Sequence, residues 1–321
     1  MMNKFAVILT SIFLAVAAVV PVDAADSLPV WAYPVNPPGT KPVADDGALM
    51  HVPNSTAAYT LTQIRDLFSP PDWHPDNHPS MPDVVGRGIK PGQFACGYCH
   101  LPNGLGRPEN SSLAGLPAAY IVRQVAEFRS GARKSSEPAS LPVNLMLAVA
   151  KLVSEEDARI AAEYFASLKP APWIRIVETD TVPKTRVGGW MLIADGSGGT
   201  ESIGQRIIEM PENLERTELR DSASGFIAYV PVGSLRKGEI LITNGAGRTT
   251  PCAICHGVGL KGLGPVPALA GRSPSYIMRQ LYDIRHGTRN GQWVELMKPV
   301  VAGLNQEDMV AIAAYTASLA P

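Results

Sequence analysis

The chain has 321 residues, enough for about two or three domains. Lys and Arg together number 28, and Asp and Glu 29, so the formal net charge is -1 and there is no basic excess of the kind that binds nucleic acid. Charged residues make up 18% of the chain, and Gly and Pro number 29 each, which is typical of a compact, loop-rich protein.

The N-terminus has the pattern of an export signal. Lys4 supplies a positive charge, residues 5–20 are almost wholly apolar, and Val22-Asp23-Ala24 resembles a cleavage site. The alternative is an uncleaved membrane anchor, for which the run is short against the roughly 20 residues that a span needs. We therefore expect residues 1–24 to be a signal peptide, and the mature protein to be periplasmic without a transmembrane segment.

Residues 25–89 are rich in proline and polar residues. Such prolines prevent continuous helix and interrupt sheet hydrogen bonds, so we expect an irregular N-terminal extension that wraps a folded domain. Trp31 and Trp73 are candidate anchors for it. An apolar stripe predicts one short helix over residues 60–68.

Two histidines of this extension, His74 and His78, are four residues apart. That spacing raises a metal site as an alternative to solvated loop histidines. Pro75 and Pro79 argue against the helix that would bring the two rings together, so we favour the loop interpretation.

A five-residue motif occurs twice, as Cys96-Gly97-Tyr98-Cys99-His100 and as Cys252-Ala253-Ile254-Cys255-His256. Two cysteines two residues apart, followed at once by histidine, are the pattern of c-type haem attachment. The two thiols add to the vinyl groups of one porphyrin, and the histidine then reaches the iron. We expect two covalently attached haem c groups.

The four cysteines of these two motifs are all that the chain contains, so none is left for a disulfide. The alternatives are a single four-cysteine zinc site or two thioredoxin-like dithiols. Neither alternative accounts for a histidine directly after the second cysteine of both motifs.

The sequence around the motifs repeats at a constant offset of 156 positions (252 less 96, and 279 less 123). One unit has therefore been duplicated. An apolar stripe predicts a helix from Pro117 to Gly131 and its copy ending at Gly287. A second helix should close each unit, beginning after Ser154 and after Asn305, where a capping residue precedes acidic residues.

The closing helices differ by 151 positions (305 less 154), so the connection before them varies in length, and we expect it to be a loop. Met146 and Met297 each lie eight residues before the closing helix (154 less 146, 305 less 297). Methionine is a common second axial ligand of electron-transfer haems, so we expect this pair to ligate iron. The alternatives are gap-filling core methionines and, for the second haem, His286.

On these residues the chain resembles the class I cytochromes c, in their tandem, two-haem form. The resemblance covers about residues 90–170 and 238–321, and implies two small all-α domains wrapped around haem that work as electron carriers. The family often has a proline whose carbonyl holds the haem-ligating histidine. Pro267 fits that position, and the first unit has Ser111 there, whose carbonyl could serve equally.

Residues 171–237 lie between the two units and are not part of the resemblance. Segments 174–177, 206–210 and 226–230 have the pattern of short strands, and Asp195–Gly199 that of a loop. We expect a small β-rich insert. The whole chain is then mainly α: signal peptide 1–24, extension 25–89, cytochrome domain 90–170, insert 171–237 and cytochrome domain 238–321.

The function that we predict is periplasmic transfer of single electrons through two His/Met-ligated haems. Redox proteins, such as a dehydrogenase or reductase donor and an oxidase acceptor, would be the partners. One alternative is a haem enzyme, either a two-haem peroxidase or a sulfur-compound oxidase, which would need one open iron and an acid or base above it. A second is the cytochrome subunit of a larger dehydrogenase.

Overall fold

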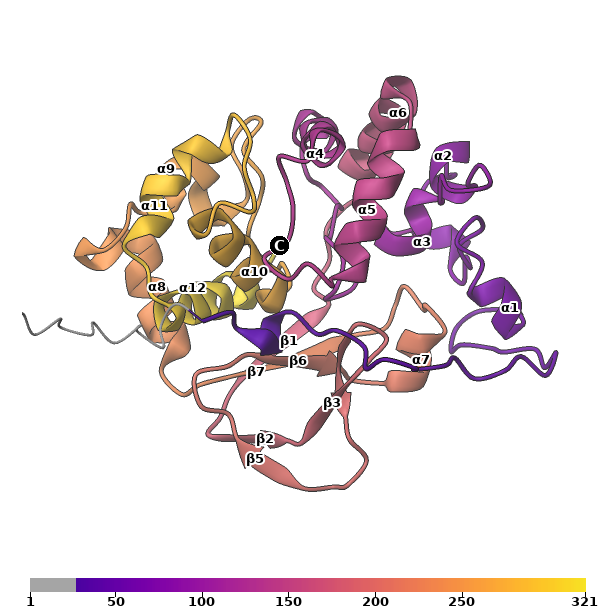
Figure 1. The fold of residues 1–321 in the computed structure, drawn as a ribbon, viewed down its shortest axis with the longest axis horizontal. Coiled ribbons are helices and arrows are strands. Elements are labelled where there is room, and N and C mark those ends of the chain that lie inside the picture. Colours follow the sequence, from indigo (N-terminus) through magenta and orange to yellow (C-terminus); the bar gives the residue numbers. More distant parts are fainter. Residues whose placement is uncertain (1–26) are drawn as a thin grey trace, which may run out of the picture.

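A computed structural model describes residues 27–321, and the predicted signal peptide lies outside this range. Figure 1 shows two helical bodies side by side, with strands of the insert below them. The first body is formed by residues in purple and magenta, the second by residues in orange and yellow. Within residues 27–321, no helix is both long and apolar enough to cross a membrane.

The first helical body contains the predicted long helix and the closing helix. Its helices are α3 (Cys96–His100), α4 (Ala118–Ser130), α5 (Leu141–Leu152) and α6 (Glu155–Ser167), and α2 (Asp83–Gly86) of the extension packs on α3 and α6. Helix α4 follows Pro117 and ends at Gly131, whose φ of 74° is left-handed and suits glycine. Ser154 caps α6 by accepting a hydrogen bond from the Asp157 amide at 2.9 Å. Both helix predictions are confirmed.

The second body repeats this arrangement. Its helices are α8 (Ser234–Asn244), α9 (Ala253–His256), α10 (Pro274–Arg285), α11 (Lys298–Ala302) and α12 (Gln306–Ser318), with 3-10 turns η4 (Gly245–Gly247), η5 (Val258–Leu260) and η6 (Val294–Leu296). Asn305 and Asp308 form a capping box at the start of α12. Helices α8 and α12 pack closely at Gly238, where an added Cβ would lie 2.1 Å from the Ala311 carbonyl oxygen.

Two predictions of local structure are wrong. The connection that holds Met146 is not a loop but the 12-residue helix α5. After Pro142 its sequence consists largely of Leu, Met, Ala and Lys, which favour helix. The helix expected over residues 60–68 is only α1 (Leu61–Ile64). It ends early because the Asp66 carboxylate accepts a hydrogen bond from the Phe68 amide and forms a turn.

The insert contains the three predicted strands, arranged as one sheet in the order β1 (Ile174–Glu178), β7 (Phe226–Val230), β6 (Ile208–Pro211). Strands β1 and β7 are parallel, and β6 is antiparallel to β7. Two further antiparallel pairs were not predicted: β2 (Thr181–Pro183) with β5 (Thr200–Ser202), and β3 (Thr185–Gly188) with β4 (Met191–Ala194). Helix α7 (Leu214–Glu218) precedes β7.

The N-terminal extension contacts all three other parts. Its 3-10 turns are η2 (Val30–Ala32) and η3 (Pro75–Asn77). Trp31 packs against the core of the second body. Trp73 is buried in a separate cluster and donates a hydrogen bond from Nε1 to the Leu219 carbonyl of the insert at 2.8 Å. Both tryptophans therefore anchor the extension, as expected.

Candidate functional site

A cavity of about 220 Å³ opens in the second helical body. Four of the residues that line it are Cys252, Cys255, His256 and Met297, which are the four that the sequence singles out in this unit. They come from three different segments: the turn into α9, α9 itself and the junction of η6 with α11. The fold therefore brings the second predicted set together around one space.

Part of the wall of this cavity comes from the first body. Tyr120, Gln124 and Glu127 on α4 line it together with residues of α10. The second site is thus closed by the neighbouring unit, and the boundary between the units is part of the site.

The ring of each motif histidine is oriented by a backbone carbonyl. His256 Nδ1 lies 2.8 Å from the Pro267 oxygen, and His100 Nδ1 lies 2.8 Å from the Ser111 oxygen. A carbonyl can only accept, so Nδ1 carries the proton and Nε2 keeps its lone pair for a metal. Burial lowers the pKa of both rings, which favours the neutral, ligating form. Both carbonyl partners are those that the resemblance implies.

The first predicted set lies on two helices. Cys96, Cys99 and His100 belong to α3, while Met146 lies half-buried in α5. The His100 ring packs edge-on against Phe165 of α6, with ring centroids 6.0 Å apart. The large cavity includes none of these four residues. The structure therefore gathers the second set around a cavity, and places the first set on two helices, α3 and α5, of its own body.

The state of the cysteines bears on the zinc and dithiol alternatives. All four are free, and within residues 27–321 no group of three or more His, Cys, Asp or Glu side chains could hold a metal ion. Burial raises the pKa of Cys96 to about 12 and that of Cys252 to about 11. A reactive dithiol needs a lowered thiol pKa, so neither alternative is supported.

The chemistry of the cavity wall fits a haem. Arg272 and Arg289 are buried and line the cavity, and each has an Nε without a hydrogen-bond partner. Buried guanidinium groups need anionic or hydrogen-bonding partners. The two propionate carboxylates of a haem are such partners, while the apolar walls suit its ring.

The rival ligands lie elsewhere. His286 does not line the cavity; its ring stacks on Tyr282 with centroids 3.9 Å apart. His74 contacts Asp221 at 2.9 Å and His78 contacts Asp72 at 3.1 Å, so each histidine of the extension pairs with a different carboxylate. Met278 and Met309 are fully buried core residues.

Comparison with known proteins decides the family. Over 68 residues the chain is 41% identical to cytochrome c-554(548) of Halomonas halodenitrificans, a match that covers 82% of that protein and 21% of this chain. The chain belongs to the class I cytochromes c. No protein-family profile matches it.

Longer matches cover about 70% of the chain. The thiosulfate dehydrogenase electron acceptor of Thiomonas intermedia is 26% identical over 231 residues, or 71% of this chain and 80% of that protein. The crystal structure of reduced cytochrome c4 from Pseudomonas stutzeri aligns with 70% of this cytochrome and 93% of that chain, at 21% identity and a TM-score of 0.46.

Sequence reasoning missed one part of the site, the polar network at the boundary between the units. Arg133 and Arg289 are its centre. The sequence does contain a sign of this network, because the same Gly-x-Arg pattern follows the long helix in both copies. Only the structure shows that these two arginines meet.

Proposed function

We propose that this cytochrome transfers single electrons between redox proteins through two covalently attached haems. The donor would be a dehydrogenase or reductase, and the acceptor an oxidase or another cytochrome. We further propose that the protein works in the periplasm after removal of residues 1–24, and that the two haem domains span residues 90–170 and 238–321.

One observation carries the proposal: Cys252, Cys255, His256 and Met297 meet at a single cavity. The two thiols of Cys252 and Cys255 would bond the porphyrin, and His256 and Met297 would ligate its iron. By the repeat, Cys96, Cys99, His100 and Met146 would do the same in the first unit. A bound haem iron with two protein ligands supplies a one-electron change of charge.

The residues around the predicted haem would move little when the charge of the iron changes. The Pro267 and Ser111 carbonyls fix the imidazole rings, so the ligating nitrogen does not turn away when the charge changes. Cavity residues such as Leu281 and Ile284 are buried, and they keep water away from the ring. A rigid, low-dielectric shell of this kind favours electron transfer over ligand exchange.

The relatives support the choice of partners. A similar protein is named as the electron acceptor of thiosulfate dehydrogenase. A dehydrogenase of a reduced sulfur compound is therefore one donor class to try first.

A redox titration of the purified protein tests the proposal. Stepwise oxidation of the dithionite-reduced protein by hexacyanoferrate(III) should consume two one-electron equivalents per chain, one for each predicted haem. Consumption of no equivalents, or turnover of hydrogen peroxide or thiosulfate by the protein alone, would contradict an electron carrier and favour the enzyme alternative.

A further inference from the structure

The two units carry the same motif but present it to very different surroundings. In the second unit the segment around the motif is exposed and apolar. The exposed fractions are 64% for Ile254, 93% for Val258 and 59% for Leu263. Leu296, 69% exposed, also lines the haem cavity. We call these four residues the open face. Cys255 and Val266, which adjoin Ile254 and pair with Leu263 respectively, also line the cavity, so the face lies beside it.

The first unit has the same segment, 156 positions earlier, but it is buried. The counterpart of Ile254 is Tyr98, which is 8% exposed, and that of Leu263 is Arg107, which is 6% exposed. Pro102, the counterpart of Val258, is buried as well. One surface of the duplicated unit is therefore open in the second copy and covered in the first.

The insert provides one part of the cover. The Arg220 guanidinium lies 3.7 Å from the centre of the Tyr98 ring and donates a hydrogen bond to the Tyr98 carbonyl at 2.8 Å. Asn103 donates from Nδ2 to the Ser222 carbonyl at 2.7 Å. The loop that follows α7 therefore lies directly on the first haem motif.

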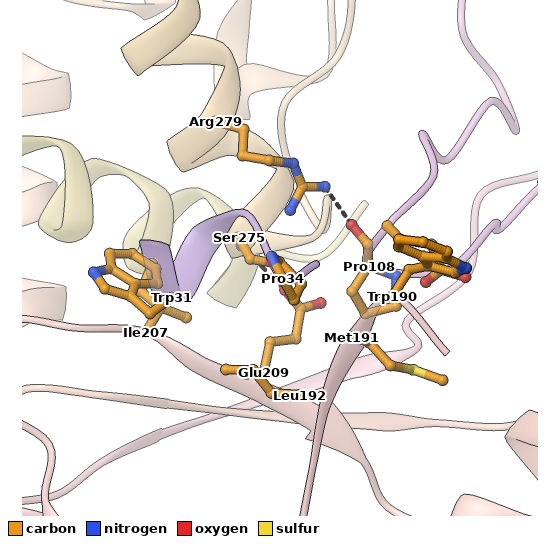
Figure 2. Close-up of a pocket in the computed structure, with 11 residues that line it drawn as sticks. Trp31, Pro34, Pro108, Trp190, Met191, Leu192, Ile207, Glu209, Ser275 and Arg279 are labelled. Carbon is orange, nitrogen blue, oxygen red and sulfur yellow. Dashed lines mark hydrogen bonds between the residues drawn. The ribbon is translucent and has the colours of Figure 1, made fainter. Parts of the chain in front are cut away.

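The cover continues along the next loop of the first unit. Arg107 forms a buried ion pair with Glu109 at 2.9 Å, and its Nη2 lies 3.7 Å from the Met191 sulfur of β4. Figure 2 shows Arg279 of α10 pointing at the Pro108 carbonyl, to which it donates a hydrogen bond. Only a cavity of about 10 Å³ remains in this contact.

The N-terminal extension covers the other side of the motif. The Ala95 amide donates to the Leu67 carbonyl at 3.0 Å, immediately before α3. A Cβ added at Gly97 would lie 2.8 Å from the Val85 carbonyl oxygen, so the extension touches the backbone of the motif itself. The Trp73 bond to Leu219 joins the extension to the insert loop, which makes the cover continuous.

We propose that a redox partner docks on the open face of the second unit, and that the insert and the extension keep the matching face of the first unit closed to partners. Electrons then reach or leave the first haem through the second. This inference rests on the proposed electron-transfer function and adds where the partner binds.

The charges around the open face define the partner. Between Glu239 and Asp283 the sequence has no acidic residue, while Arg248 and Lys261 are both exposed there. Arg248 is paired with Asp308, and the nearby Glu295 is paired with Lys298. Lys261, which lies between Val258 and Leu263 in the sequence and contacts the Pro321 oxygen at 3.4 Å, therefore gives the face one exposed basic residue beside its apolar centre. The partner that fits is a protein with an apolar contact patch and an acidic rim.

The test uses the haem-loaded, full-length protein and an acidic blue copper protein, plastocyanin, as the probe. Val258→Glu places a negative charge in the open face. Val232→Glu is the matched control, because Val232 is 63% exposed and lies outside that face. Binding is measured by calorimetry with redox-inert, zinc-substituted plastocyanin, and oxidation of the reduced cytochrome by the copper form is measured by stopped flow.

We expect Val258→Glu to weaken binding and slow oxidation by about tenfold, and Val258→Lys to strengthen both, because charge at a docking patch acts on association. Val232→Glu should change both by less than about twofold. Equal effects of the two glutamate variants, or none, would overturn the docking proposal. Oxidation by hexacyanoferrate(III) distinguishes failure of the docking proposal from failure of the proposed electron-transfer function. A variant that this small oxidant oxidises rapidly is still an electron carrier, even if the docking proposal fails.

Discussion

Arg133 and Arg289 face each other across the boundary between the two haem units, and their backbones pair as an antiparallel bridge. They are equivalent residues of the repeat, 156 positions apart. Each guanidinium crosses to the other unit: Arg133 donates to Tyr276 and Gln280, and Arg289 donates to Tyr120 and Gln124. The units are therefore joined by a buried polar network with approximate two-fold symmetry.

This network should contribute to the stability of the whole chain. Arg133→Ala removes three hydrogen bonds from a buried charged group, with donor–acceptor distances of 2.6–2.9 Å. We expect the free energy of unfolding to fall by about 2–4 kcal/mol, measured by denaturant titration of the haem-loaded protein. Arg159→Ala is the control, because Arg159 pairs only with exposed glutamates and should cost less than about 1 kcal/mol. Similar costs for the two variants would contradict the role of the network.

The predicted methionine ligands can be tested one at a time. Met146→Ala and Met297→Ala should each convert one haem to a high-spin form that binds carbon monoxide and has a lower reduction potential. Optical spectra and a potentiometric titration measure these changes. Met278→Leu is the control, since Met278 is a core residue and its replacement should leave both spectra unchanged. A wild-type spectrum in either alanine variant would exclude that methionine as a ligand.

A buried hydrogen bond of Tyr33 should help to hold the extension to the second unit. The Tyr33 hydroxyl donates to the Asp283 carboxylate at 2.7 Å, and burial, with the Asp283 charge, raises the pKa of Tyr33. Tyr33→Phe should reduce the free energy of unfolding by about 1.5–3 kcal/mol, because the acceptor is charged. Tyr229→Phe is the control, as the described part of the structure gives the Tyr229 hydroxyl no hydrogen bond. An equal loss in both variants would show that the Tyr33 bond is not the cause.

One ion pair within the extension, whose histidine also contacts Tyr164 of the first unit, should depend on pH. The hydrogen bond to Asp72 raises the pKa of His78, whose other ring nitrogen lies near the Pro79 carbonyl and the Tyr164 hydroxyl. The stabilisation is fully present below the unfolded-state pKa, and it is lost as the pH rises through the folded-state pKa. The Tm difference between wild type and Asp72→Asn should therefore be larger at about pH 5.5 than at about pH 8.5. A difference independent of pH would contradict this assignment.

The repeat made much of the helical structure predictable. A single offset located α4 and α10, and capping residues located the starts of α6 and α12, because these signals are local. The histidine partners followed from the resemblance, since a carbonyl is present whatever the side chain at position 111 or 267.

The parts of the fold and site that could not be predicted depend on contacts between segments far apart in the sequence. The segment around Met146 is α5 rather than a loop, and its counterpart in the second unit is η6 with α11, so this part is helical in both copies. The difference in length falls in the irregular residues 134–140 before α5. Burial of Tyr98 depends on Arg220, which is 122 residues away in the sequence. The exposed and the covered face have the same local motif, so only tertiary structure distinguishes them.

The most direct test of the central claim is the optical spectrum of the purified protein, recorded with its haem stoichiometry. We predict two covalent haems per chain, both low-spin in the oxidised and reduced states and both unchanged by carbon monoxide. One high-spin haem, or one that binds carbon monoxide, would contradict ligation of both irons by His and Met. Absence of covalent haem from protein made with an intact maturation system would contradict the assignment of the two motifs.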